Sequence, residues 1–165
     1  MPAPAPFDGV SGRVSLGQIA QNIVAHYKWL YRWSNEIGGD VPLNLKKLAQ
    51  LAFQHARLFR ELVAPFLPLA NNQPFVRALI SEFAWSGMEW ATLAEMRTDL
   101  AAIYQKCGEL FTHVRDNVPE ARSFAQRTYD VNGQEIETVP EISKNATPAV
   151  AQAVTLTGEL RALFA

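Results

Sequence analysis

The sequence predicts a mainly α-helical fold, a bundle of four or five helices with a small β-hairpin before the C-terminal helix. Three observations lead to this prediction. Apolar residues recur at a spacing of three and four over most of residues 15–118, which is the period of one helix face. Proline and glycine stand where these patterns stop. After Pro119, turn-forming and alternating residues replace the helical pattern.

The first helix is expected over residues 15–37. A flexible lead over residues 1–14 precedes it, because this stretch is rich in proline and contains the turn formers Asp8-Gly9 and Ser11-Gly12. Ser15 is a suitable N-cap, and Gly38-Gly39 ends the pattern. One face of this helix carries the apolar residues Ile19, Ile23, Tyr27, Leu30 and Ile37.

A second helix is expected over residues 42–64. Asp40 is placed to cap it, and Pro42 falls in its first turn, where a missing N–H costs nothing. Pro65 and Pro68 end it. Its apolar stripe is formed by Leu45, Leu48, Ala52, His55, Phe59 and Leu62.

The third helical pattern runs over residues 74–118 and ends at Pro119. An unbroken helix of this length would span roughly 65 Å, which is long for a domain of this size. We therefore expect a break near Ser86-Gly87, although the sequence leaves open whether the stretch forms one helix or two.

The last part of the chain predicts a hairpin and a final helix. Residues 123–129 and 135–139 read as short strands around the turn at residues 130–133. Thr147 is a suitable N-cap, with Pro148 at the first helical position. The chain thus divides into a lead (1–14), a helical bundle (15–118) and a hairpin-plus-helix unit (119–165) that packs on the bundle or on a partner.

Composition limits the function classes. The 165 residues are 48% hydrophobic and 19% charged, with a formal net charge of -1, which is typical of a globular domain. Because Lys and Arg are scattered, we expect no nucleic-acid partner. No apolar stretch is long enough to span a membrane, and the opening run lacks the features of a signal peptide. With its single cysteine, Cys107, the sequence predicts a cytoplasmic protein.

The histidines are the candidates for site chemistry. His55 lies on the apolar stripe of the second helix, so it is either a satisfied core histidine or a ligand to a metal or small molecule, together with His26 or a carboxylate such as Glu82 or Glu89. We interpret Glu109 and His113 as a surface ion pair and Cys107 as a small buried hydrophobe. No phosphate loop or nucleophile elbow occurs in the sequence, so we expect no cofactor and favour a non-enzymatic role.

The aromatic residues are the most unusual local feature. Aromatic side chains surround most of one helix between residues 27 and 33, and two more tryptophans follow later. Three roles remain open: filling a large core, anchoring a protein–protein interface, or lining a ligand pocket. The interface candidates are Tyr27, Trp29, Tyr31, Trp33, Trp85 and Trp90.

Residues 122–165 also resemble a known group of proteins. The stretch Thr128-Tyr129-Asp130-Val131-Asn132-Gly133, the Thr147-Pro148 helix start and Leu160-Arg161-Ala162-Leu163 are similar to small uncharacterised proteins encoded among phage and prophage structural genes. The resemblance implies a particle or accessory component, located in an assembled particle if the chain is phage-derived. We therefore expect a structural or interaction protein that self-associates as a homo-oligomer or docks on a protein partner, the alternative being the ligand- or metal-binding bundle.

Overall fold

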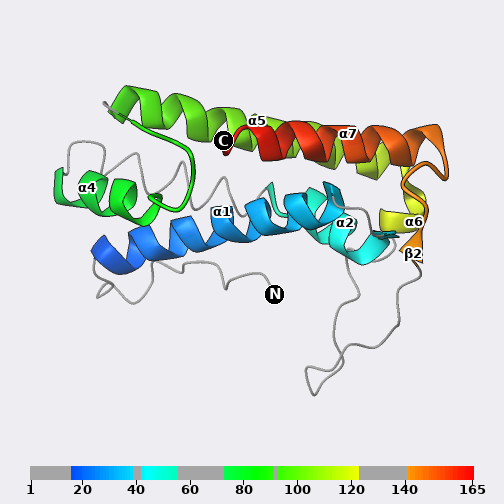
Figure 1. The fold of residues 1–165 in the computed structure, drawn as a ribbon, viewed down its shortest axis with the longest axis horizontal. Helices are drawn as coiled ribbons and strands as arrows, with labels where there is room; N and C mark the ends of the chain where they lie inside the picture. The colour runs from blue at the N-terminus through cyan, green and yellow to red at the C-terminus, as the bar shows by residue number, and fades with distance from the viewer. Residues whose placement is uncertain (1–15, 39–41, 56–72, 91–92, 123–140) are drawn as a thin grey trace, which may run out of the picture.

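Three long helices set the shape of the molecule. The fold is known from a computed structural model, which describes residues 16–38, 42–55, 73–90, 93–122 and 141–165. The long helices are α1 (Leu16–Gly38), α5 (Leu93–Asn117) and α7 (Pro148–Ala162). In Figure 1, α1 and α5 run in the same direction and α7 runs back against both. α7 packs on both α1 and α5 and so connects them.

Shorter elements close the ends of this arrangement. α4 (Gln73–Glu82) packs on α1, while α2 (Leu45–Ala52) contacts α1, α5 and the short α6 (Pro119–Arg122). Strands β1 (Leu43–Asn44) and β2 (Glu141–Ile142) form an antiparallel pair in which Leu43 lies opposite Ile142. The predicted fold class, a mainly helical bundle with a small two-stranded sheet before the C-terminal helix, is confirmed.

The partner of strand β2 comes from a distant part of the chain. β1 lies between α1 and α2 in the sequence, so the small sheet joins residues near position 43 to residues near position 142. The two strands predicted for the hairpin (123–129 and 135–139) and the turn between them lie outside the described residues.

The core is built from regular stripes on the long helices. Along α5 the buried residues alternate at spacings of four and three: Met96, Leu100, Ile103, Cys107, Leu110 and Val114. This is the spacing of a seam between two aligned helices. α7 faces that seam with Val150, Ala153, Leu156 and Leu160. At its edge, Lys106 on α5 lies 2.6 Å from Glu109 and 2.9 Å from Glu159 of α7.

The prediction of one continuous helix over residues 42–64 is wrong at its start and is interrupted at Phe53 and Gln54, while its predicted end lies outside the described residues. α2 begins at Leu45, because Leu43 and Asn44 pair with β2, and the Asn44 side chain rather than Asp40 caps it by accepting a hydrogen bond from Lys47 N at 3.1 Å. α2 ends at Ala52, and Phe53 and Gln54 form a turn. The remainder of the predicted helix, from residue 56, lies outside the described residues.

The expected break in the third helical pattern is confirmed. α4 ends at Glu82 and residues 83–90 form turns and irregular structure before α5. Gly87 N donates a hydrogen bond to Phe164 O at 3.1 Å. A Cβ atom at Gly87 would lie only 3.0 Å from the carbonyl carbon of Ala165, so glycine allows this close approach to the end of α7.

The other helix boundaries agree closely with the sequence. α1 extends one residue beyond the predicted 15–37 at its C-terminal end. α7 begins at Pro148, and the Thr147 hydroxyl accepts a hydrogen bond from Val150 N at 3.1 Å. Within the described residues, the structure contains no helix with the length and apolar character needed to cross a membrane.

Candidate functional site

Half of the six aromatic interface candidates belong to the core. Tyr27, Trp29 and Trp33 have exposed fractions of 0%, 1% and 6%, and the rings of Trp29 and Trp33 pack 4.6 Å apart. These side chains fill the interior, which is the first of the three roles considered above. In this structure a docking partner does not reach them.

Trp90 has a local role in attaching the segment before α5. Its Nε1 donates a hydrogen bond of 2.7 Å to Asp99 on α5, and its ring packs edge-on against Phe83 at 5.1 Å. Trp90 therefore ties the α4–α5 connection to α5. The two remaining candidates, Tyr31 and Trp85, are half-buried and lie together.

Tyr31 and Trp85 form an open pocket with Phe164, which we call the aromatic pocket. The ring of Tyr31 lies 5.4 Å from each of the other two rings, and Trp85 lies 6.0 Å from Phe164. The pocket has a volume of about 380 Å³ and is lined by Tyr31, Trp85, Ser86, Gly87, Gly158, Arg161, Ala162, Phe164 and Ala165. It lies where α1, the α4–α5 connection and the end of α7 meet.

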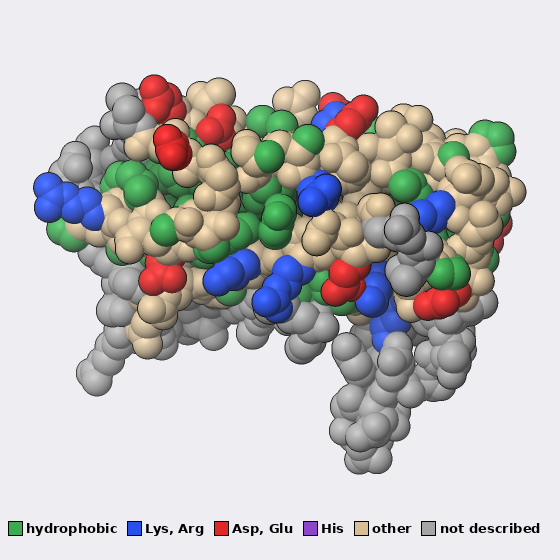
Figure 2. Space-filling model, in the orientation of Figure 1, with side chains coloured by type: hydrophobic (Ala, Val, Ile, Leu, Met, Phe, Trp, Pro, Cys, Tyr) green, Lys and Arg blue, Asp and Glu red, His purple; other side chains and the backbone are tan. Residues whose placement is uncertain are grey.

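The charged side chains at the aromatic pocket are basic. Arg161 lines it, and Lys28 Nζ lies 5.8 Å from the Trp85 ring centre in a cation–π arrangement. Figure 2 shows hydrophobic side chains gathered on one half of the visible face, with Lys, Arg, Asp and Glu side chains around them. Among the described residues, none accepts a hydrogen bond from the buried Nε1 of Trp85.

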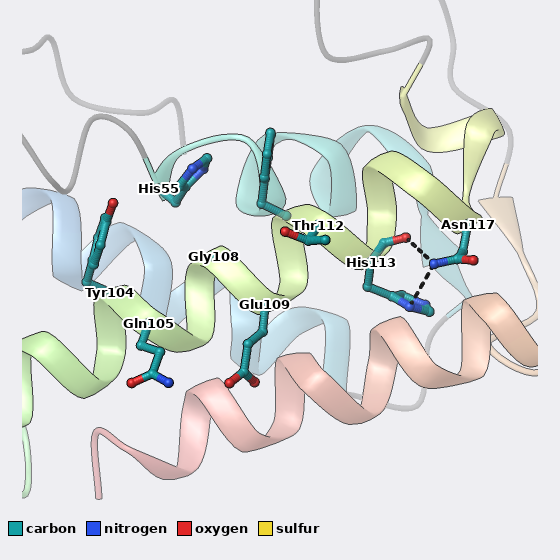
Figure 3. A pocket seen from close by; sticks show the side chains of 9 residues that line it. His55, Tyr104, Gln105, Gly108, Glu109, Thr112, His113 and Asn117 are labelled. Carbon is teal, nitrogen blue, oxygen red and sulfur yellow. Dashed lines mark hydrogen bonds between the residues drawn. The ribbon is translucent and has the colours of Figure 1, made fainter.

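A second concave surface lies across α5, and we call it the His55 groove. Its volume is about 790 Å³, and it is lined by His55, Tyr104, Gln105, Gly108, Glu109, Phe111, Thr112, His113 and Asn117. Figure 3 shows His55 and Tyr104 on one side of α5, Gln105 and Glu109 on the other, and Gly108 between them.

His55 packs against aromatic rings in this groove. Its ring centre lies 4.2 Å from that of Phe111 and 6.3 Å from that of Tyr104, with both pairs inclined by less than 40° (37° and 32°). Phe53 braces Phe111 edge-on at 5.0 Å. Burial lowers the pKa of His55 below its ordinary value of 6.5, because desolvation disfavours the charged imidazole. The Nδ1 atom is buried without a hydrogen-bond partner among the described residues.

The residues considered as metal ligands lie in different surroundings. His26 is buried in α1 with an exposed fraction of 2%, His55 lies in the groove, Glu82 ends α4 and Glu89 is exposed. Across the described parts of the chain, no three His, Cys, Asp or Glu side chains are close enough to hold a metal ion together. The structure thus assembles no three-ligand set from these candidates within the described residues.

Two other sequence interpretations have clear outcomes. The predicted ion pair between Glu109 and His113 is wrong. Glu109 forms its ion pair with Lys106, and His113 Nε2 lies 2.7 Å from Ala149 O, which links α5 to the start of α7. Cys107 is buried as expected, and its burial raises the pKa of the thiol to about 12. It is therefore an unreactive core residue at neutral pH.

Both concave surfaces contain residues that the sequence reasoning missed. Phe164 and Arg161 line the aromatic pocket, and Gly108 and Gly158 lie in helix interiors, one in each surface. A Cβ atom at Gly108 or Gly158 would meet nothing within 4 Å. Glycine inside a helix costs about 1 kcal/mol relative to alanine. A glycine within a predicted helix is therefore a sequence signal of a surface where the backbone is left uncovered, and Gly108 and Gly158 both gave this signal.

Comparison of the chain with models of protein families, with curated proteins and with solved structures found no match.

Proposed function

We propose that this chain is a non-enzymatic docking protein that binds an acidic segment of a partner protein at the aromatic pocket. The observation that carries the proposal is the concave cluster of Tyr31, Trp85 and Phe164 with Lys28 and Arg161 beside it. Phe164 is buried and packs against the half-buried rings of Tyr31 and Trp85. Aromatic side chains that remain partly open to solvent, as those two do, are the usual anchors of protein–protein interfaces.

The shape of the aromatic pocket favours a side chain as its occupant. The space of about 380 Å³ lies at the lower end of the range for ligand pockets. Gly158 leaves a gap in the surface of α7 at the pocket wall. An apolar side chain of the partner fits against this gap and against the half-buried rings of Tyr31 and Trp85.

The charges specify the residues that flank this side chain. Arg161 and Lys28 are the basic groups at the pocket, and Arg161 is the single charged side chain among the described lining residues. Arginine pairs with carboxylates through two parallel hydrogen bonds. A segment with an apolar residue between Asp or Glu residues therefore complements the pocket in both shape and charge.

The resemblance of residues 122–165 to proteins from phage and prophage structural regions supports the same class of function. We propose that the partner is another component of an assembled particle. Self-association is the other form of the proposal, with a second copy of the chain supplying the acidic segment.

The test uses the four tryptophan indole signals of the ¹⁵N-labelled protein. The probe is a blocked peptide, Asp-Glu-Leu-Asp-Glu, and its counterpart with lysine in place of each acid. We expect the acidic peptide to shift the Trp85 indole signal and to leave those of the buried Trp29 and Trp33 in place. Trp85→Phe assigns the signal.

Matched variants decide between specific docking and general charge attraction. Arg161→Glu is expected to weaken binding by about tenfold or more, since charge-assisted hydrogen bonds contribute about 1.5–3 kcal/mol. Arg115→Glu, at the other end of the bundle on α5, is expected to bind as the wild type does. Equal shifts with the lysine peptide, or equal losses in both variants, would falsify the proposal. A peptide-independent, concentration-dependent mass would instead identify a second copy as the occupant.

A further inference from the structure

We infer that the His55 groove binds a flat, uncharged aromatic molecule that carries a hydrogen-bonding substituent, such as a phenol or a neutral nitrogen heterocycle. The ligand lies across α5 at Gly108, between His55 and Tyr104 on one side and Gln105 on the other (Figure 3). This site is separate from the aromatic pocket and shares none of its lining residues.

The floor of the groove is the backbone of α5 at Gly108. Residues three and four positions away on a helix are surface neighbours, and for Gly108 these are Tyr104, Gln105, Phe111 and Thr112, all of which line the groove. Gly108, which has no side chain, therefore leaves a gap at the centre of these lining residues. Because its Cβ would meet nothing within 4 Å, the packing of the protein does not require glycine there. A ligand lying against the backbone does require it.

One wall of the groove consists of rings with similar orientations. His55 packs on Phe111 with ring centres 4.2 Å apart and is inclined by 32° to the Tyr104 ring, so a flat ligand contacts aromatic side chains along this wall. Phe53 and the guanidinium of Arg115, 5.3 Å from the Phe111 ring centre, hold Phe111 in place. This wall favours an aromatic ligand over a saturated one.

His55 also supplies a directed hydrogen bond. Because its buried Nδ1 has no partner among the described residues, the neutral tautomer with the proton on Nε2 avoids burying an unsatisfied N–H. The Nε2–H group is then the donor that His55 offers to a ligand. Gln105 and Thr112 are exposed on the groove and offer further hydrogen-bonding groups.

The charges of the lining favour an uncharged ligand. Glu109 is the carboxylate among the described lining residues, and Lys106 already pairs with it at 2.6 Å. His113 is engaged with Ala149 O. The groove therefore offers neither a free cation to an anionic ligand nor an unpaired carboxylate to a cationic one among these residues.

The experiment titrates the labelled full chain with naphthol, and with decahydronaphthol as the saturated counterpart of the same size. We expect naphthol to shift the Gly108 amide signal and the His55 ring signals, and decahydronaphthol to bind about tenfold more weakly or less, since it cannot stack. Equal affinity for the two compounds overturns the inference, as does a naphthol titration that leaves both signals in place.

Gly108→Leu fills the floor of the groove and is expected to weaken naphthol binding by about tenfold or more, while helicity is retained because leucine favours helix more than glycine. Ala94→Leu is the matched control, since Ala94 is exposed on the same helix and lines neither concave surface. Naphthol binding that survives Gly108→Leu, or that falls equally in Ala94→Leu, refutes the site. Circular dichroism checks that both variants are folded.

Discussion

At the residue scale, His55 is the candidate site residue whose pKa the fold shifts. Its ring packs on Phe111 and lies near Tyr104, and its pKa is lowered by desolvation. The sequence placed His55 on an apolar stripe and so indicated an unusual histidine. Its partners could not be predicted, because the turn at Phe53 and Gln54 interrupts the predicted helix before His55, and spacing does not reveal that His55 meets Phe111 and Tyr104 of α5.

The lowered pKa makes the stability of the fold sensitive to acid. At a pH well above the ordinary value of 6.5, His55 is neutral in both states and contributes no pH dependence. As the pH falls through this value, the unfolded chain takes up a proton that the folded protein resists, so the free energy of unfolding decreases until the pH lies below the folded pKa. His55→Gln is expected to remove this part of the decrease. Urea unfolding between about pH 5 and pH 7.5 measures it, and a constant difference between variant and wild type over that range would contradict it.

The residues of the aromatic pocket could be predicted only in part from the sequence. Tyr31 and Trp85 were both among the aromatic candidates, but so were Tyr27, Trp29 and Trp33, which are buried. A helix with aromatic residues on most sides does not reveal which side is covered, because that depends on where α4 and α7 pack. The residues next to Arg161 in the sequence do not distinguish it from the other Lys and Arg residues, so its place in the pocket could not be predicted.

At the element scale, boundaries were predictable where local signals set them. Thr147-Pro148 starts α7 and Gly38 ends α1, since capping and termination act within a few residues. α2 was mispredicted because its start depends on a distant segment: β2 pairs with Leu43 and Asn44 and removes them from the helix. Hydrophobic spacing carries no information about such a pairing.

The cap of α7 can be tested directly. Thr147→Ala removes the acceptor for Val150 N and is expected to lower the free energy of unfolding by about 1 kcal/mol. Thr155→Ala is the control, because Thr155 is exposed within the same helix and its hydroxyl bonds only the Ala151 carbonyl, already a helix acceptor. Thermal or urea unfolding compares the two, and equal effects would show that Thr147 does not act as a cap.

At the scale of the whole molecule, the same substitution at two glycines is expected to have opposite effects. Gly158→Ala adds a methyl group into open space within α7 and should stabilise the protein by about 1 kcal/mol. Gly87→Ala places a Cβ atom 3.0 Å from the Ala165 carbonyl carbon and should destabilise it by about 1–3 kcal/mol, because the α4–α5 connection must move away from the end of α7.

Unfolding curves of both variants measure the sign. Stabilisation by Gly87→Ala would mean that the hydrogen bond from Gly87 N to Phe164 O does not hold these segments together. The break in the helical pattern was predictable from Ser86-Gly87, but its purpose was not. The glycine serves a contact with the far end of the chain, which sequence spacing cannot reveal.

The packing of α1 on α7 also has a consequence for synthesis on the ribosome. α7 begins at Pro148, about 110 residues after the end of α1 at Gly38, which corresponds to about 5–20 s of translation at the usual rates. During that interval the apolar surface of α1 that α7 covers has no native cover from that helix. The surface of α1 that α7 covers therefore stays exposed on the nascent chain until α7 has been synthesised.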